Sequence, residues 1–235
     1  MLAAAAVCPH PPLLVPQIAA GAAGETEELR QACLSAVGHL YDASADQLVV
    51  VGNGPIPGTA APGATGSLSG FGVPVEVALS PRGGPGPATL PLSVTIGAWL
   101  LREAGYGGEI RARVVRDQAT TAECMELGAR TSAFPGRTAL LIMGDGSACR
   151  EERSPGYVDP RAIPFDDEVA RALAKGDPAG LAALDPALAI ELRAAGRPPW
   201  QVLAGAAAGQ EWRADLLYSG APYGVGYFVA TWLPA

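Results

Sequence analysis

Short runs of consecutive apolar residues recur along the chain and predict buried strands. These runs cover residues 2–7, 48–51 and 139–143. Each run ends at proline or glycine, as expected of a strand that is covered on both faces and stops at a turn. Alternating apolar and polar residues over 73–79 and 110–115 predict two further strands that are half-buried.

A second pattern, with apolar residues three or four positions apart, predicts helices between these strands. The segment 25–40 carries Leu29, Cys33, Val37 and Leu40 at this spacing and has acidic residues in its first turn. By the same pattern and its start and stop signals, helices are also expected at 92–104, 119–130, 165–177, 178–185, 186–196 and 200–208. Residues 214–235 contain two strand-like runs around a Gly/Pro turn, the second at 225–232.

Helices that alternate with buried strands indicate an α/β fold. The strand-helix-strand order over residues 2–51 favours a parallel pair. We therefore expect one domain over residues 1–235, with three α/β/α layers and helices on both faces of a central, mostly parallel or mixed sheet. Residues 54–72 and 80–91 are rich in glycine and proline and predict long surface loops, which we expect to roof a cleft near His10.

The composition of the chain argues against some classes of function. The chain has 235 residues, 49% of them hydrophobic and 17% charged, and a net charge of -7. Its basic residues, with Lys175 the single lysine, form no cluster, which argues against a nucleic-acid partner. A secretory signal and an uninterrupted apolar run of about 18 residues are both missing, so we expect a cytoplasmic protein without a membrane partner.

Four cysteines, Cys8, Cys33, Cys124 and Cys149, are far apart in the sequence. They form no C-x-x-C pair, which argues against a zinc ribbon, a thioredoxin-type site and a small disulfide scaffold. Most are therefore expected to be buried free thiols.

Three turns follow the three buried runs, at residues 8–10, 52–55 and 144–150. Ligands of open α/β sheets bind beyond the carboxyl ends of the strands, so these turns would line one cleft if the strands are neighbours. The candidate binding residues in the turns are His10, Asn53, Pro55, Asp145, Ser147 and Arg150.

His10 and Asp145 are also the candidate catalytic residues. Flanking prolines in VCPHPP restrict the position of the His10 imidazole, which favours metal binding or proton transfer. The alternative is a histidine that bonds to the backbone and shapes its turn. Asp145 and Arg150 also have two interpretations: they bind a polar substrate, or they pair with each other. Ser147 lacks a G-x-S-x-G setting, and no nucleotide-binding glycine motif is present.

The three turns and their order resemble the class III extradiol ring-cleavage dioxygenase superfamily, which includes the protocatechuate 4,5-dioxygenase catalytic subunit and Memo-like proteins. AAVCPHPPLL, DQLVVVGNGP and ALLIMGDGSACR look like the family's strand-turn segments, and the later helices and APYGVGYFVA follow in the same order. In active members two histidines and a glutamate hold Fe(II), and another histidine moves protons. By this resemblance His10 matches the first metal ligand, the second falls at about Pro55, and the proton-transfer histidine falls at Ala148.

Because proline cannot coordinate iron and alanine cannot move protons, the resemblance implies a degenerate member without the Fe(II) site. We favour a protein without a cofactor that binds a small molecule or a protein partner, or an enzyme of unknown reaction, and a homodimer is one open arrangement. A second hypothesis is a rebuilt zinc or copper site of His10 and Cys8 with Cys149 or Asp145. A third is a surviving Fe(II) dioxygenase, in which Glu211 is a positional candidate for the carboxylate ligand.

Overall fold

A computed structural model describes residues 1–80 and 88–235 and places seven strands of the described chain in one central sheet. The strands, in spatial order, are β3 (Gly58–Thr59), β6 (Ile110–Arg116), β2 (Gln47–Gly54), β7 (Thr138–Met143), β1 (Leu2–Cys8), β9 (Tyr227–Pro234) and β8 (Trp212–Gly220). The four strands β6, β2, β7 and β1 are parallel, and the other three pair antiparallel. The predicted mixed, mostly parallel sheet is confirmed.

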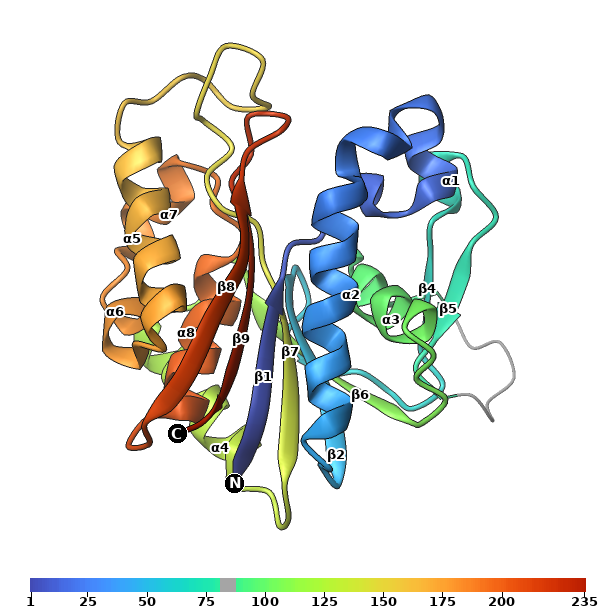
Figure 1. Cartoon of the computed structure of the whole chain (residues 1–235), viewed down its shortest axis with the longest axis vertical. Helices are drawn as coiled ribbons and strands as arrows, with labels where there is room; N and C mark the ends of the chain where they lie inside the picture. The colour runs from blue at the N-terminus through green and yellow to red at the C-terminus, as the bar shows by residue number, and fades with distance from the viewer. Residues whose placement is uncertain (81–87) are drawn as a thin grey trace.

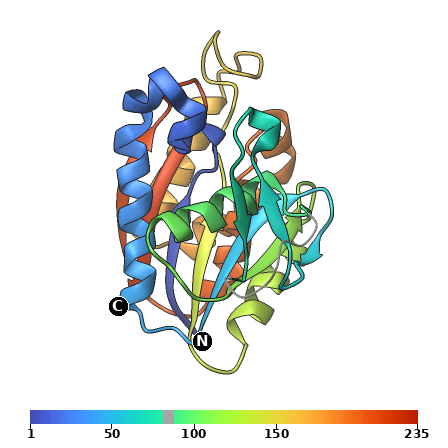
Figure 2. The same ribbon diagram turned by 90° about the vertical axis from the view of Figure 1, so that its right-hand side faces the viewer.

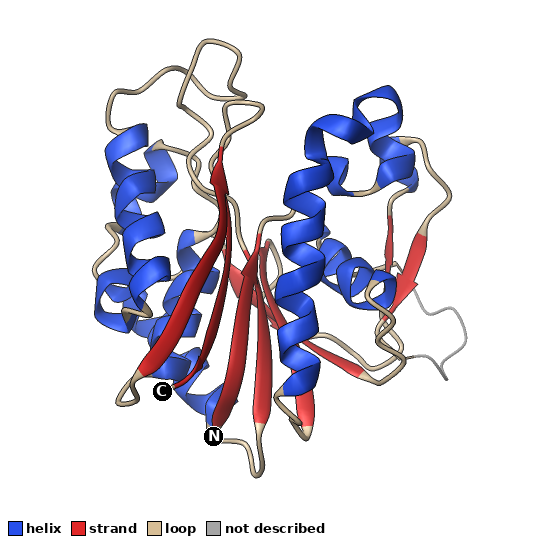
Figure 3. Cartoon of the chain, viewed as in Figure 1, coloured by secondary structure: helices blue, strands red, loops and turns tan. Residues whose placement is uncertain are grey.

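Helices cover both faces of this sheet, which confirms the three-layer α/β/α class (Figures 1 and 3). One face carries α2 (Glu27–Asp42) and α3 (Leu92–Glu103). The other carries α4 (Thr121–Ser132), α5 (Ala162–Lys175), α6 (Pro178–Ala182), α7 (Pro186–Glu191) and α8 (Arg197–Ala207). Within the described ranges, every helix is too short or too polar to cross a membrane.

Strand β1 separates two apolar cores because successive side chains of a strand point to opposite faces. Ala4, Ala6 and Cys8 belong to the core beneath α2 and α3. Ala5 and Val7 belong to the core beneath α5 and α8. Burial of all seven residues of β1 confirms the interpretation of its apolar run as a strand covered on both sides.

Four predicted helices begin at slightly different residues, and α2 begins at Glu27, two residues after its predicted start. Helix α4 starts after Thr120, whose hydroxyl accepts a bond from the Glu123 N–H while the Glu123 carboxylate accepts from the Thr120 N–H, a complete capping box. Helices α5 and α8 each begin three residues before their predicted starts, and both contain proline in the first turn. Proline is tolerated there because the first N–H groups of a helix have no partner within it.

The interpretation of 54–72 as irregular loop is wrong in part. This stretch contains β3, β4 (Thr65–Ser67) and the 3-10 turn η3 (Ser69–Phe71). The strand predicted at 73–79 shortens to β5 (Glu76–Ala78), which pairs with β4 in a separate two-stranded sheet against α3 (Figure 2). Gly66 explains this packing, because a Cβ there would overlap the Thr95 side chain of α3. Much of the second predicted loop, residues 81–87, lies outside the described residues.

The segment that joins β1 to α2 is also more regular than its proline content predicts. It forms the turns η1 (Pro12–Leu14) and η2 (Ala20–Thr26) with the short helix α1 (Pro16–Ala19) between them. Pro12 and Pro16 each occupy the first position of their element, where proline's fixed φ is suited to helical geometry. This segment places a small layer of helical turns above α2 (Figure 1).

Helices α4 and α8 cross with their backbones in contact. A Cβ on Gly128 of α4 would overlap the Val202 carbonyl oxygen of α8, and a Cβ on Gly205 would overlap the Met125 carbonyl oxygen. Both glycines are therefore required by close approach, and the crossing holds α8 against the sheet.

We predict that Gly128→Ala lowers the free energy of unfolding by about 2–4 kcal/mol, because the added methyl group must push two backbones apart. Gly38→Ala on α2 is the matched control, since a Cβ at Gly38 meets nothing within 4 Å. That variant should gain about 0.5–1 kcal/mol from higher helix propensity. Urea unfolding measures both, and equal effects of the two substitutions would contradict the close crossing.

Candidate functional site

The carboxyl ends of the parallel strands lie together at one edge of the sheet. Strands β2, β7 and β1 are direct neighbours, as the single-cleft hypothesis requires, and β6 adds a fourth end beside β2. The residues that follow these ends are Asn53, Asp117, Asp145 and His10. Side chains at this edge can therefore act together although they come from distant parts of the chain.

His10 and Asp145 are in contact. The His10 main-chain N–H donates to Asp145 Oδ1 at 2.7 Å, and His10 Nδ1 lies 3.5 Å from the same oxygen. Nδ1 is buried without a hydrogen-bond partner, and the residue is 8% exposed. Asp145 thus ties the turn after β1 to the turn after β7. Burial raises the pKa of the neighbouring Tyr227 well above its ordinary value, and the negative charge of Asp145 adds to this rise.

Cys8 packs against Cys33 of α2 directly behind this turn. Both are fully buried free thiols. Burial raises the pKa of the Cys33 thiol well above its ordinary value, and hydrogen bonding to Cys8 adds to the rise. A buried thiol with a raised pKa is a poor nucleophile and a poor metal ligand. All four cysteines are buried and free, which confirms the expectation for them.

Ser147 and Arg150 belong to a different cluster, which is centred on Asp166. The Asp166 carboxylate accepts bonds from the Ser147 N–H at 2.8 Å, the Ser147 hydroxyl at 2.7 Å and Arg150 Nη1 at 2.8 Å. Burial raises the pKa of Asp166, and these hydrogen bonds oppose the rise. Arg150 therefore pairs with Asp166 and not with Asp145, and Ser147 serves to fix the loop after β7.

Asn53 borders a cavity of about 320 Å³ at the ends of β2 and β6. Asn53 Nδ2 donates to Asp117 Oδ1 at 2.7 Å, while Asn53 Oδ1 is buried without a partner. Arg193 and Arg197 line the same cavity. Pro55 is exposed and borders a separate cavity of about 440 Å³, formed by the predicted loop residues and Leu90. His10 lines neither of these two cavities.

Arg197 is a buried arginine in the lining of this cavity, and its charge has no acidic partner among the described residues. The residue is 1% exposed, and burial lowers the pKa of its guanidinium. Its Nη atoms donate to the carbonyl oxygens of Ala119 at 2.5 Å and Asp117 at 3.1 Å and to the Gln201 side chain, while Nε has no partner. In the described part of the chain no carboxylate lies within 4.0 Å of it. Arginine remains protonated even when buried, so the wall is positive.

Arg193 is the second arginine of this cavity and is exposed. Its backbone is left-handed, with φ of 55°, and its Nη1 donates to the Pro155 carbonyl oxygen at 3.0 Å. The left-handed residue ends α7 and turns the chain toward α8. Arg193 and Arg197 are four residues apart on this turn and both face the same space.

The residues that the iron and rebuilt-metal hypotheses require do not come together. Cys8 and Cys149 belong to cores on opposite faces of the sheet. Glu211 lies next to the start of β8, which pairs with the end of β9, so it is at the edge opposite His10. Across residues 1–80 and 88–235, no group of three or more His, Cys, Asp or Glu side chains is arranged to hold a metal. The donor set does not fit a 2-His-1-carboxylate iron site.

Sequence reasoning did not single out Asp117, Arg193 or Arg197. Asp117 lies two residues after the strand predicted at 110–115, so the rule that placed Asn53 at the edge would also have placed Asp117 there. Arg197 stands in AGRPPW, where glycine and two prolines mark a helix start, but its burial has no signal in the sequence. His39 lies exposed in the last turn of α2.

Comparisons with known proteins identify the fold but no activity. No protein-family model matches the chain, and no curated protein matches it. Among solved structures, the crystal structure of the uncharacterized protein JW3007 from Escherichia coli K12 is similar, with a TM-score of 0.57 and 14% sequence identity. The match covers 98% of this chain and 99% of that one, so the whole chain adopts a fold seen elsewhere.

We predict that protein purified without chelator contains far less than one equivalent of iron, zinc or copper, and that His10→Ala does not change its metal content. The reason is that the imidazole contacts only one carboxylate that could complete a metal site. Elemental analysis by mass spectrometry makes the measurement on both proteins. Stoichiometric metal that disappears in His10→Ala would show that His10 is a ligand.

Proposed function

We propose that this protein binds a small organic carboxylate at the carboxyl edge of its sheet, as a dioxygenase-like protein that lacks the family's Fe(II) site and needs no cofactor. The observation that carries the proposal is the buried guanidinium of Arg197, which borders a cavity and has no acidic partner within the described residues. A buried charge without a counter-ion is costly to stability. An anionic ligand would supply the missing charge.

Arg102 shows what a purely structural arginine looks like in the same fold. It donates to four carbonyl oxygens, those of Ala78, Leu79, Tyr106 and Gly108, and ties β5 to the end of α3. None of its nitrogens is both buried and unpaired. Arg197 also bonds to carbonyl oxygens, but its buried Nε is unpaired and the residue lines a cavity. This difference supports a binding role for Arg197 beyond loop fixation.

The lining of the cavity supports a carboxylate with an apolar body. Guanidinium groups bind carboxylates through paired N–H donors, and Arg193 is a second arginine of the same lining. Ala189, Ile190 and Ala194 give the cavity an apolar side. Its volume of about 320 Å³ is within the usual range for small-molecule sites, about 300–1,000 Å³.

The proposed setting is the cytoplasm. The chain has four free cysteines, and all of them are buried in the two apolar cores or beside them. Thiols remain reduced in a cytosolic environment, where disulfides are rare. The four free thiols support a reducing compartment, and the proposed cytoplasmic location rests on them.

We predict that pentanoate binds with a Kd of about 1 mM, whereas pentanamide, its neutral counterpart, binds at least tenfold more weakly because it cannot pair with the guanidinium groups. NMR titration of labelled protein measures the affinity and follows the Nε–Hε signal of Arg197 directly. Pentanoate should shift that signal at the same concentrations that saturate the backbone signals of the cavity.

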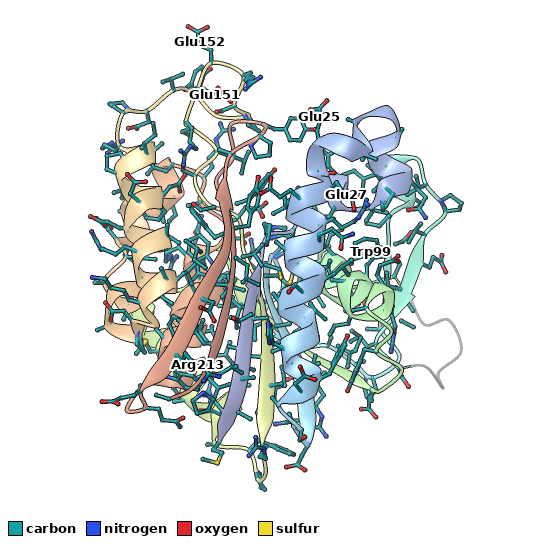
Figure 4. All side chains as sticks on the ribbon, viewed as in Figure 1. Glu25, Glu27, Trp99, Glu151, Glu152 and Arg213 are labelled. Carbon is teal, nitrogen blue, oxygen red and sulfur yellow. The ribbon has the colours of Figure 1, made fainter. Side chains whose placement is uncertain are left out.

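Arg193→Gln should weaken pentanoate binding by about fivefold to tenfold, the loss of one charge-assisted contact of about 1–1.4 kcal/mol. Arg213→Gln is the matched control, because Arg213 is exposed on β8, at the opposite edge of the sheet (Figure 4). It should bind pentanoate like the wild type. Equal binding of pentanoate and pentanamide would contradict the proposed function.

A further inference from the structure

We infer that the ligand of this cavity also carries an ammonium group next to its carboxylate, so that the site takes a small aliphatic α-amino acid. This inference rests on the proposed function and adds the second half of the ligand. Its basis is a pair of oxygen acceptors, Asn53 Oδ1 and the Asp117 carboxylate, on the wall that also presents Arg197.

The orientation of the Asn53 amide follows from its contact with Asp117. Asn53 Nδ2 donates to Asp117 Oδ1 at 2.7 Å. A carboxylate can only accept, so the amide nitrogen must face Asp117 and the amide oxygen must face away from it. That oxygen is buried and has no donor in the structure. Buried acceptors are nearly always paired. Asn53 is part of the cavity lining, so we take a ligand group as the donor to this oxygen.

Asp117 adds a negative charge to the wall that holds the positive charge of Arg197. Its carboxylate accepts from Asn53 and forms no ion pair within 4.0 Å among the residues that the structure describes. It is exposed where it borders the cavity. A ligand ammonium group has three donors, enough to bond both Asp117 and the unpaired oxygen of Asn53.

Arg197 and Asn53 both bond to Asp117, and this arrangement indicates which class of amino acid fits the cavity. Arg197 Nη2 donates to the main-chain oxygen of Asp117, while Asn53 bonds the side chain of the same residue. The two charges of the ligand must therefore be close together, as in an α-amino acid, and not at opposite ends of a long chain. The apolar residues Ala189, Ile190 and Ala194 would then contact an aliphatic side chain.

Charge balance distinguishes this ligand from simpler ones. A carboxylate alone would neutralise Arg197 but would lie beside Asp117 and leave the Asn53 oxygen unpaired. An amine alone would leave Arg197 without a counter-ion. An α-amino acid pairs both sets of groups and adds no net charge to a protein that already carries -7.

The test compares 2-aminopentanoate with pentanoate and pentylamine by NMR titration. In the wild type 2-aminopentanoate should bind at least tenfold more tightly than either, about 1.4 kcal/mol. In Asp117→Asn the ratio of the 2-aminopentanoate affinity to the pentanoate affinity should fall to about one, because the attraction to the ammonium is lost. Asp215→Asn, which removes an exposed carboxylate from β8, is the matched control and should retain the ratio.

A second readout does not depend on a variant. The side-chain amide signals of Asn53 in the wild type should shift with 2-aminopentanoate and not with pentanoate. If both compounds bind equally and neither moves these signals, the amino group is not recognised, and this inference fails while the proposed function stands. If neither compound binds, the proposed function and this inference both fail.

Discussion

The first turn of α8 meets the end of β7 backbone against backbone, and the candidate site depends on this contact. The Gly196 N–H donates to the Asp145 carbonyl oxygen at 2.7 Å, and a Cβ on Gly144 would overlap the Cα of Gly196. Two glycines therefore allow a helix to start directly on the sheet. Because Arg197 follows Gly196, the same contact places its guanidinium beneath the ends of β2 and β6.

The two turns that the sequence marked most strongly are held together by main-chain groups and the Asp145 carboxylate, and the His10 imidazole makes neither bond. Asp145 accepts from the His10 N–H, and Gly144 donates to the Cys8 carbonyl oxygen. Any residue except proline at position 10 could make the first bond. The structure thus supports the interpretation of Asp145 as a residue that joins two turns, and His10 Nδ1 is buried without a hydrogen-bond partner.

Much of the fold could be predicted because it depends on local patterns. The apolar runs of β1, β2 and β7 identify central strands, and the rule for parallel sheets places their ends at one edge. Alternation along β1 could also assign Cys8 to one face of the sheet, but Cys149 lies in the loop after β7, where alternation assigns no face. The candidate site was harder to predict, because Arg197 and Asp117 are 80 residues apart in sequence and meet through one hydrogen bond. No periodic pattern of apolar residues in the sequence predicts such a pair.

The position of the charges explains how a fold of this kind could retain a ligand site without metal donors. A metal ion at the carboxyl edge attracts an anionic ligand by its charge, and a desolvated guanidinium attracts the same ligand by the same Coulomb term. The proposed site lies at β2 and β6, one strand away from the His10 and Asp145 turns. There α7 and the turn before α8 border a cavity, whereas His10 lines neither of the two cavities described above. Under the proposed function, the ligand therefore binds at the ends of β2 and β6, where the sheet edge has both a cavity and an unpaired charge.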